Sequence, residues 1–279
     1  MKHVLFCGNT KVFDGMLTGM LSIFKRSENE EPITFYIYTA DCTYLKPQYT
    51  PLTEEMRAFF EKVAQKYNKD NKVVMIDVTD LYNKEFKGCP NEHCYASPYT
   101  LLRLLADLVP GMPDKLLYLD CDIMFNKDIN EIWNIDVTNY EYAAARDQYG
   151  KILCYPNYIN AGVLLFNLKH MKETGILDKA RKKLRQKHLP FADQSALIRS
   201  TSKRKMLPQK FNCQAVLNKK TVIRHFAKRL YLTPYPHTAN IKQWHVADVH
   251  NKLKYHQFDD ILNEYLALKH SFEEGEKHE

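Results

Sequence analysis

The chain has 279 residues, of which 45 % are apolar and 26 % are charged, a mixture typical of a globular protein that buries a large core unaided. Its net charge of +7 comes without a nucleic-acid-binding motif, so we expect no nucleic-acid partner. No run approaches the roughly 18 apolar residues of a membrane-spanning helix, and the run at 4–7 is too short for a signal peptide core. Because the seven cysteines are scattered and odd in number, we expect reduced thiols in a cytoplasmic protein.

The first half of the chain alternates predicted strands with predicted helices. Short apolar runs indicate buried strands, and apolar residues at helical spacing indicate the helices between them. The strands are expected at 4–6, 33–38, 73–76 and 115–119, and the helices at 13–24, 53–67 and 98–108. This order favours a sheet with helices on both faces.

The second half is more mixed. Two more buried strands are expected at 142–146 and 161–166, a basic helix at 169–187, and a short helix beginning at Asp193. From 222 the sequence is irregular until a last amphipathic helix. Its apolar face is expected to consist of Phe258, Ile261, Leu262, Tyr265 and Leu266. We therefore expect one domain at 1–250, followed by a C-terminal helix and a charged tail at 251–279.

Two carboxylates, Asp120 and Asp122, directly follow the predicted strand at 115–119. In open α/β sheets, ligands bind at the carboxyl ends of the strands. Two carboxylates one residue apart can turn toward one hard cation, such as Mg²⁺ or Mn²⁺. The Asp-x-Asp pattern is a weak signal alone, but no solvated loop explains two charges after four apolar residues. The pair therefore predicts a metal site.

Polar residues further along the chain have structural explanations when each is taken singly. The turn residues Asn160 and Gly162 fit a loop, and Asp193 fits a helix cap. By the same reasoning, His225 fits a buried core histidine, and Lys242 fits a surface charge. Their order along the chain is what points to a shared function.

The ordered motifs resemble glycosyltransferase family 8, retaining enzymes that include galactosyltransferases of bacterial lipooligosaccharide and surface-polysaccharide synthesis. The resemblance covers nearly the whole chain. The motifs are His3-Val-Leu-Phe-Cys7, Tyr99-Thr-Leu-Leu-Arg103-Leu, Tyr118-Leu-Asp-Cys-Asp122, Asn160-Ala-Gly-Val-Leu-Leu, Asp193-Gln194, and His225 with Lys242-Gln-Trp244.

The resemblance implies an α/β fold of the GT-A type, which binds nucleotide sugars. We expect a mostly parallel central sheet flanked by helices, with a small helical and irregular C-terminal extension. It also implies one bound manganese ion, with magnesium as the alternative, held by Asp120, Asp122 and His225. Asp193 and Gln194 are implied at the reacting sugar. The other implied donor-binding residues are Asn9, Thr10, Arg103, Cys121, Asp147, Asn160, Ala161, Gly162 and Lys242.

The sequence departs from the family pattern in two places. The N-terminal strand continues into Gly8-Asn9-Thr10-Lys11, where the family usually has an acidic residue that helps to hold uracil. Lys242 follows His225 by 17 positions and is followed by Gln243, whereas the family keeps Lys-Pro-Trp close to its histidine. Lys228 and Arg229 are therefore alternatives to Lys242 for binding the diphosphate.

The expected activity is metal-dependent transfer of a hexose from UDP-galactose or UDP-glucose to a cell-surface glycan or glycolipid, as in lipopolysaccharide biosynthesis. Peripheral contact with the inner face of the membrane is a further expectation. Because Gln194 is an amide and a poor nucleophile, we favour a front-face reaction over the double displacement of retaining glycosidases.

Two other functions fit parts of the sequence. An aspartate-based phosphatase or phosphotransferase also uses Asp-x-Asp after an apolar strand, although such a motif usually lies near the start of its domain. A non-catalytic protein that binds lipid or polyanions fits the basic run at 179–187.

Overall fold

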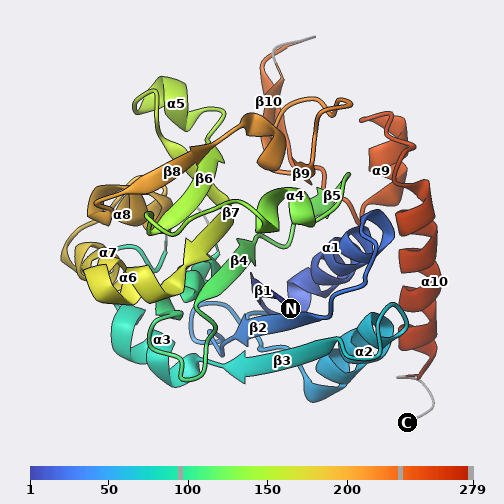
Figure 1. Cartoon of the computed structure of the whole chain (residues 1–279), viewed down its shortest axis with the longest axis horizontal. Coiled ribbons are helices and arrows are strands. Elements are labelled where there is room, and N and C mark those ends of the chain that lie inside the picture. Colours follow the sequence, from blue (N-terminus) through green and yellow to red (C-terminus); the bar gives the residue numbers. More distant parts are fainter. Residues whose placement is uncertain (94–96, 232–234, 276–279) are drawn as a thin grey trace.

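A seven-stranded sheet forms the centre of the structure, a computed structural model that describes residues 1–93, 97–231 and 235–275 (Figure 1). Strand β7 runs against the other six strands of this sheet, so the predicted mostly parallel sheet is confirmed. The strands lie in the order β3 (Lys72–Asp77), β2 (Ile33–Thr39), β1 (Lys2–Cys7), β4 (Lys115–Leu119), β7 (Ile159–Asn167), β6 (Tyr142–Arg146) and β8 (Arg204–Leu207).

The central strands are nearly continuous apolar runs because both faces of the sheet are covered. Successive side chains of β1 alternate between two cores: Val4 and Phe6 pack on one side, and Leu5 and Cys7 pack on the other. Complete burial of each large apolar side chain contributes roughly 1.5–3 kcal/mol before conformational entropy is subtracted. The central strands are thereby fixed in position, and so are the polar residues that follow them.

Helices cover both faces of the sheet, as predicted. One core packs against α1 (Phe13–Arg26), α2 (Glu54–Gln65), α4 (Asn130–Trp133) and α10 (Asp259–Gly275). The other core packs against α3 (Thr79–Phe86), the 3₁₀ helix η2 (Pro98–Leu105), α6 (Leu168–Thr174), α7 (Ile176–Gln186) and α8 (Ala192–Ser200).

The structure differs from the predicted elements at several points. The helix expected at 98–108 is a 3₁₀ helix that ends at Leu105. The helix expected at 169–187 is two helices, because Gly175 has a left-handed backbone (φ 65°) that ends α6 and starts α7. Leu266, expected on the apolar face of the last helix, is 45 % exposed. Helix α3 was not predicted.

Short elements complete the fold and bring distant segments together. Strand β5 (Ile123–Phe125) pairs antiparallel with β9 (Ile223–His225), so that Ile123 lies opposite His225. The other short elements are η1 (Thr10–Val12), α5 (Gly150–Leu153), η3 (Gln209–Phe211), β10 (Arg229–Tyr231), β11 (His237–Ala239) and α9 (Val246–Asn251).

Helix α10 lies along α1 at the side of the molecule (Figure 1). Three ion pairs of 2.7–2.8 Å join the two helices: Lys25–Glu264, Arg26–Asp260 and Asp14–Lys269. The boundary between 1–250 and 251–279 stays a prediction. Within the described residues, no helix has the length and apolar character that crossing a lipid bilayer requires.

Candidate active site

A cavity of about 740 Å³ opens at the edge of the sheet where β1 and β4 end and the reversed strand β7 begins. Three short segments of the chain, at 7–9, 120–122 and 160–162, line it from these strand ends. Asp193 and Gln194 of α8 line it from another side, and Lys228 and Lys242 come from the irregular part of the chain. This position agrees with the ligand sites of open α/β sheets.

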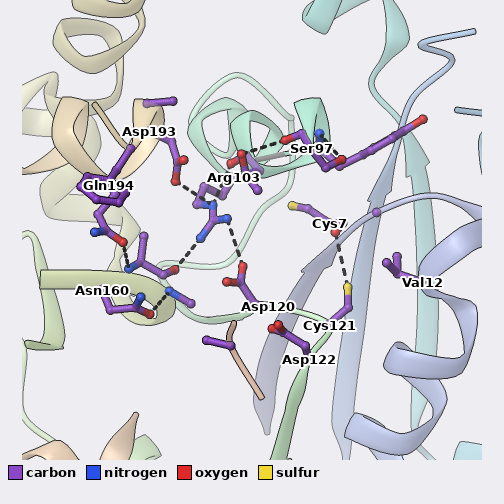
Figure 2. A pocket seen from close by; sticks show the side chains of 18 of the residues that line it. Cys7, Val12, Ser97, Arg103, Asp120, Cys121, Asp122, Asn160, Asp193 and Gln194 are labelled. Atoms are coloured by element: carbon purple, nitrogen blue, oxygen red, sulfur yellow. Dashed lines mark hydrogen bonds and ion pairs between the residues drawn. The ribbon is translucent and has the colours of Figure 1, made fainter. Parts of the chain in front are cut away.

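The two aspartates lie together at the end of β4, whereas Cys121 between them turns toward Cys7 (Figure 2). The β5–β9 pairing brings His225 to this point. Its Nε2 lies 3.0 Å from Asp122 Oδ1 and 3.9 Å from Asp120 Oδ2. The candidate ligand atoms of the three residues all lie within 4.8 Å of one another. The three residues therefore form a group that can hold one divalent ion.

A chain of hydrogen bonds orients the imidazole of His225 through its Nδ1. The carboxylate of Asp147 can only accept, so Asn160 must present its amide nitrogen there, at 2.8 Å. Asn160 Oδ1 then accepts from Asn212 Nδ2 (2.8 Å), in addition to the Gly162 N–H (2.9 Å). The remaining oxygen of Asn212 faces His225 Nδ1 at 2.9 Å. This network assigns the proton to Nδ1.

With Nδ1 held by Asn212, Nε2 is the nitrogen of His225 that faces the two carboxylates. These groups need positive charge among them, supplied either by a proton on Nε2 or by a bound cation, and a metal-ligating histidine usually has its second nitrogen held by a hydrogen bond in this way. The residues therefore fit a divalent ion. Burial by itself would raise the pKa of Asp122, but Lys242 and His225 hold that pKa well below its usual range.

Lys242 reaches the site despite its distance from His225 in the sequence. Its Nζ lies 2.5 Å from Asp122 Oδ2 and 3.2 Å from the Phe226 carbonyl oxygen. The next residue, Gln243, is fully buried and donates to the Cys121 carbonyl oxygen at 2.9 Å. Gln243, where the family pattern has proline, thus fastens this segment to the aspartate loop. Lys228 also lines the cavity.

Close packing around the aspartates and His225 leaves no room for a side chain at two glycines. A side chain at Gly162 would place Cβ 2.4 Å from His225 Cε1 and 2.8 Å from Asp120 Oδ2. A side chain at Gly15 would meet the Cys121 carbonyl oxygen at 2.4 Å and Trp244 Cζ3 at 2.6 Å. Both positions therefore require glycine for space.

The buried guanidinium of Arg103 links the aspartate pair to α8. It donates to Asp120 Oδ1 at 3.0 Å and to the Ala161 carbonyl oxygen, and it stacks on the Tyr118 ring at 4.1 Å. Its Nε lies 3.3 Å from Asp193 Oδ2 but donates to the Thr100 carbonyl oxygen. Each nitrogen of the Arg103 guanidinium thus already donates to a protein group.

Two buried polar atoms of α8 at the cavity wall lack a hydrogen-bond partner with good geometry among the described residues. They are Asp193 Oδ2, an acceptor, and Gln194 Nε2, a donor, and both residues line the cavity. Burial raises the pKa of Asp193 to about 6, although Arg103 opposes this shift. Unpaired buried polar atoms at a cavity wall indicate where the polar groups of a ligand bind.

A comparison with protein families identifies the family of the chain. The family model described as glycosyl transferase family 8 matches residues 3–247. The chain belongs to this family.

Curated relatives agree with family 8 membership. The lipopolysaccharide 1,2-glucosyltransferase of Escherichia coli is 26 % identical over 215 residues, which cover 71 % of this chain and 58 % of that protein. A glycosyltransferase of Haemophilus influenzae is 32 % identical over 135 residues, 41 % of each protein. GlyA of Streptococcus pneumoniae is 36 % identical over 110 residues, 37 % of this chain and 16 % of GlyA. The matches thus span less than two thirds of these relatives.

Solved structures share the fold. The galactosyltransferase LgtC, crystallised with donor and acceptor sugar analogues, has a TM-score of 0.67 at 18 % identity, covering 94 % of this chain and 95 % of LgtC. GlyE of Streptococcus pneumoniae has a TM-score of 0.59 at 19 % identity, covering 96 % of this chain and 64 % of GlyE. The family 8 chain therefore has the predicted GT-A fold.

The structure brings most of the residues implied by the family 8 resemblance to one cavity. Thr10 is outside the lining and pairs with Thr50 at 3.0 Å, and His225 lies 3 % exposed behind Gly162. Asp193 is not a helix cap, because α8 begins at Ala192 and is preceded by Phe191. Sequence reasoning missed Asn212 entirely, since a lone asparagine in a loop gives no signal.

Proposed function

We propose that this family 8 glycosyltransferase is a retaining, divalent-cation-dependent hexosyltransferase. It transfers galactose or glucose from a UDP-sugar to a cell-surface glycan or glycolipid. One observation carries the proposal: Asp120, Asp122 and His225 converge on a single point at the cavity, with the ammonium group of Lys242 beside them. Family membership favours this reaction over the phosphatase and lipid-binding alternatives.

The three converging residues would hold the ion, with manganese expected because imidazole and carboxylate together suit it. When bound, the ion supplies positive charge that stabilises a departing diphosphate. Lys242 supplies a second positive charge; two unit charges 4 Å apart interact by about 4 kcal/mol at an effective dielectric constant of 20, and the pairing of Lys242 with Asp122 offsets part of this. Arg103 and Tyr118 hold Asp120 Oδ1 at 3.0 and 2.6 Å, which keeps Asp120 oriented.

The hydroxyl groups of the sugar are proposed to pair with Asp193 Oδ2 and Gln194 Nε2. Together these atoms offer one acceptor and one donor, the combination that a hydroxyl group satisfies. Fixing the sugar ring lowers the entropic part of the barrier. Gln194 Oε1 already accepts from the Ala161 N–H at 3.0 Å, which supports positioning rather than nucleophilic attack. We therefore retain the front-face reaction, in which the acceptor hydroxyl enters beside the departing diphosphate.

A panel of nucleotide sugars tests the proposal. With Mn²⁺ present, UDP release is expected from UDP-galactose or UDP-glucose, and chelation or Asp120→Asn should abolish it. Undiminished UDP release after both treatments would show that the metal site takes no part in the reaction. No release from any nucleotide sugar, with an acceptor mixture present, would refute the activity.

We further propose peripheral contact with an anionic membrane on the side of the cavity mouth. No acidic residue lies between Asp193 and Asp248. The basic residues of that segment are Arg199, Lys203, Arg204, Lys205, Lys210, Lys219, Lys220, Arg224, Lys228, Arg229 and Lys242. Arg224 is buried, and Lys210 and Lys242 pair with Glu131 and Asp122. The other basic residues of the segment are the ones proposed to attract an anionic bilayer surface.

Helix α5 adds exposed apolar residues next to this basic segment. Ile152 and Leu153 are 77 % and 74 % exposed, and the neighbouring Tyr149 hydroxyl accepts from the Leu230 N–H of β10 at 2.8 Å. Flotation with vesicles containing phosphatidylglycerol should show salt-sensitive binding that Ile152→Ser with Leu153→Ser weakens. Leu266→Ser, on α10 at the opposite side of the molecule, is the matched control (Figure 1). Equal binding by both variants, or none by the unmodified chain, would end this idea.

A further inference from the structure

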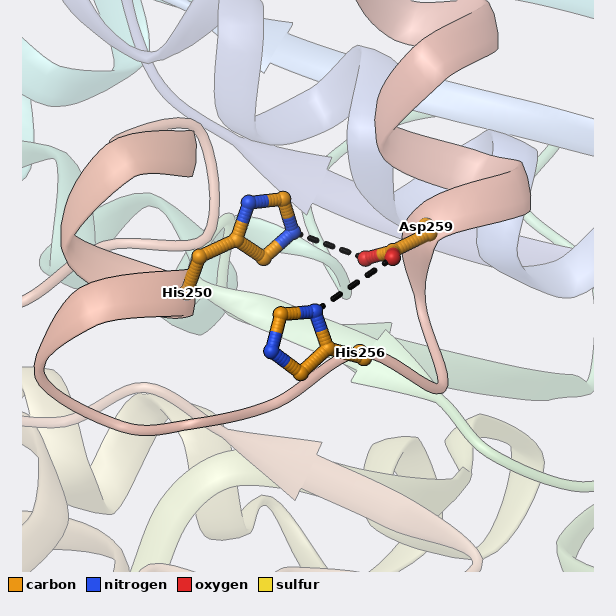
Figure 3. Close-up of side chains that lie close together, drawn as sticks. All are labelled: His250, His256 and Asp259. Atoms are coloured by element: carbon orange, nitrogen blue, oxygen red, sulfur yellow. Dashed lines mark hydrogen bonds and ion pairs between the residues drawn. The ribbon is translucent and has the colours of Figure 1, made fainter.

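We propose a second metal site, for zinc or a similar transition-metal ion, where α9 meets α10. Its ligands are His250 in α9, His256 in the connecting loop, and Asp259 in the first turn of α10. The three side chains converge from three separate positions, and both imidazole rings turn a nitrogen toward the carboxylate (Figure 3). The site is remote in sequence from the three ligand candidates of the cavity.

The distances place the three side chains within reach of one ion. His250 Nε2 lies 2.7 Å from Asp259 Oδ1, and His256 Nδ1 lies 3.5 Å from Asp259 Oδ2. The rings are nearly parallel, at 17°, with centroids 4.9 Å apart, and one candidate ligand atom from each residue lies within 4.8 Å of the others. Two imidazole nitrogens and a carboxylate oxygen are zinc ligands, and three protein ligands leave a fourth position for water. Magnesium and calcium prefer sites made of oxygen alone.

Each proposed ligand directly follows a buried residue. Val249 precedes His250, Tyr255 precedes His256, and Phe258 precedes Asp259. These three apolar residues belong to the core between the sheet and α10, and at most 7 % of each is exposed. The backbone beneath every ligand is therefore fixed before any ion binds, which lowers the ordering cost of binding.

Helix α1 anchors the same loop from the other side. Arg26 of α1 pairs with both carboxylate oxygens of Asp260 at 2.8 Å and donates to the Gln257 carbonyl oxygen at 2.8 Å. Asp260 is thus already engaged, and Asp259 is the carboxylate that faces the histidines. This arrangement differs from an ordinary surface ion pair, in which both partners are free to move.

A bound ion would join α9 to α10. Helix α9 begins two residues after Trp244, the end of the segment that carries Lys242 to the cavity. The ion would therefore hold the C-terminal helix and the lysine segment in their relative positions. Its effect is on the stability of this junction, and the group-transfer chemistry at the cavity does not require it.

Zinc and cobalt titrations of tag-free protein test the site. The protein carries Asp120→Asn to impair the cavity ligands, and the binding lost in the His256→Ala protein is what is assigned to the junction. We expect one equivalent of Zn²⁺ by calorimetry, visible absorption of tetrahedral Co²⁺, and a rise in melting temperature with Zn²⁺. His256→Ala should weaken binding at least tenfold and remove the rise in melting temperature.

His270→Ala is the matched control, because His270 is an exposed histidine of α10 that pairs with Glu274 instead. It should leave the binding of Zn²⁺ unchanged. Circular dichroism must show that the His256→Ala protein is folded, which we expect because that side chain is 66 % exposed. Absence of saturable binding, or equal binding by the His256→Ala and His270→Ala proteins, would overturn the proposal.

Discussion

The two groups of metal-ligand type in the described residues are built differently. In the cavity group, the side chains of Asp120, Asp122 and His225 are 26 %, 18 % and 4 % exposed, and each is engaged by a further protein group. In the junction group, the side chains of His250 and Asp259 are 28 % and 41 % exposed, and water reaches both.

This difference in exposure determines how strongly each group depends on the protein residues that contact it. A buried charge depends on its protein partners, because water cannot replace them, and losing one partner is costly. An exposed charge keeps its hydration, so a lost partner changes little. We therefore expect substitutions in the cavity group to have large effects on activity, and substitutions in the junction group to act only when metal is present.

The largest effect is expected from Asp122→Asn. The change removes a proposed ligand and leaves Lys242 and His225 without their shared carboxylate. A metal contribution of several kcal/mol corresponds to a loss of about 10³-fold or more in transfer rate. UDP release at saturating Mn²⁺ measures this loss, with circular dichroism as the folding control. Retention of a tenth of the activity would contradict a shared cation site.

Gly162→Ala should come next, because its Cβ would press His225 and Asp120 apart. A displacement of about 1 Å at a reaction centre can cost on the order of 10²-fold in rate. Gly19→Ala is the control, since a Cβ at Gly19 meets its first neighbour, Phe6 Cζ, at an acceptable 3.4 Å. If both variants are equally active, the cavity group is not packed as described.

The cavity group was only partly predictable from sequence. Asp120 and Asp122 gave a direct signal, because two charges after an apolar strand need an explanation. His225 and Lys242 entered only through the family resemblance, since the β5–β9 pairing is three residues long and too short to show periodicity. Asn212 gave no signal, because its role depends on groups far away in the sequence.

The fold was more predictable than the site. Strands β1, β2 and β4 are nearly continuous apolar runs, and burial on both faces forces that pattern on the sequence. Gly175 was a sequence signal for the break between α6 and α7, but the continuous basic character of the segment suggested one helix. In η2 the leucine spacing fits either helix type, so sequence could not reveal the tighter winding.

Substitutions of Asn212 test whether the hydrogen-bond chain prepares His225 for metal. Asn212→Leu removes the acceptor at His225 Nδ1 and should weaken Mn²⁺ binding roughly 10- to 100-fold, as expected for loss of such a support. Asn212→Asp keeps an acceptor there and should retain most of the affinity. Calorimetry without donor gives the affinities, and ¹⁵N NMR of histidine reads the tautomer. A His225 that carries a proton at Nε2 and none at Nδ1 would contradict the assigned network.

Lys242→Met should shift two affinities in opposite directions. The ammonium group pairs with the Asp122 carboxylate and so competes with Mn²⁺ for it. Its loss should therefore strengthen Mn²⁺ binding to the free protein. The same loss should weaken UDP binding roughly tenfold, the value of one hydrogen bond to a charged group of about 1.5 kcal/mol. Lys228→Met is the comparison, with a smaller expected effect on UDP. Weaker binding of both ligands by Lys242→Met would show that Lys242 only supports the fold.

The smallest effect on catalysis is expected at the junction. Without added metal, His256→Ala should change the free energy of unfolding by no more than about 1 kcal/mol, the range of exposed ion pairs, and UDP release should be unaffected. With free Zn²⁺ at 100 times its dissociation constant, the unmodified chain should gain about 2.7 kcal/mol. Denaturant unfolding with and without Zn²⁺ measures both values.

Because exposed ligands interact strongly only when an ion replaces their water, a gain in stability that depends on His256 would distinguish a metal site from an ion pair. A large loss of stability in the His256→Ala protein without metal would instead show that the junction group, like the cavity group, depends on its protein partners.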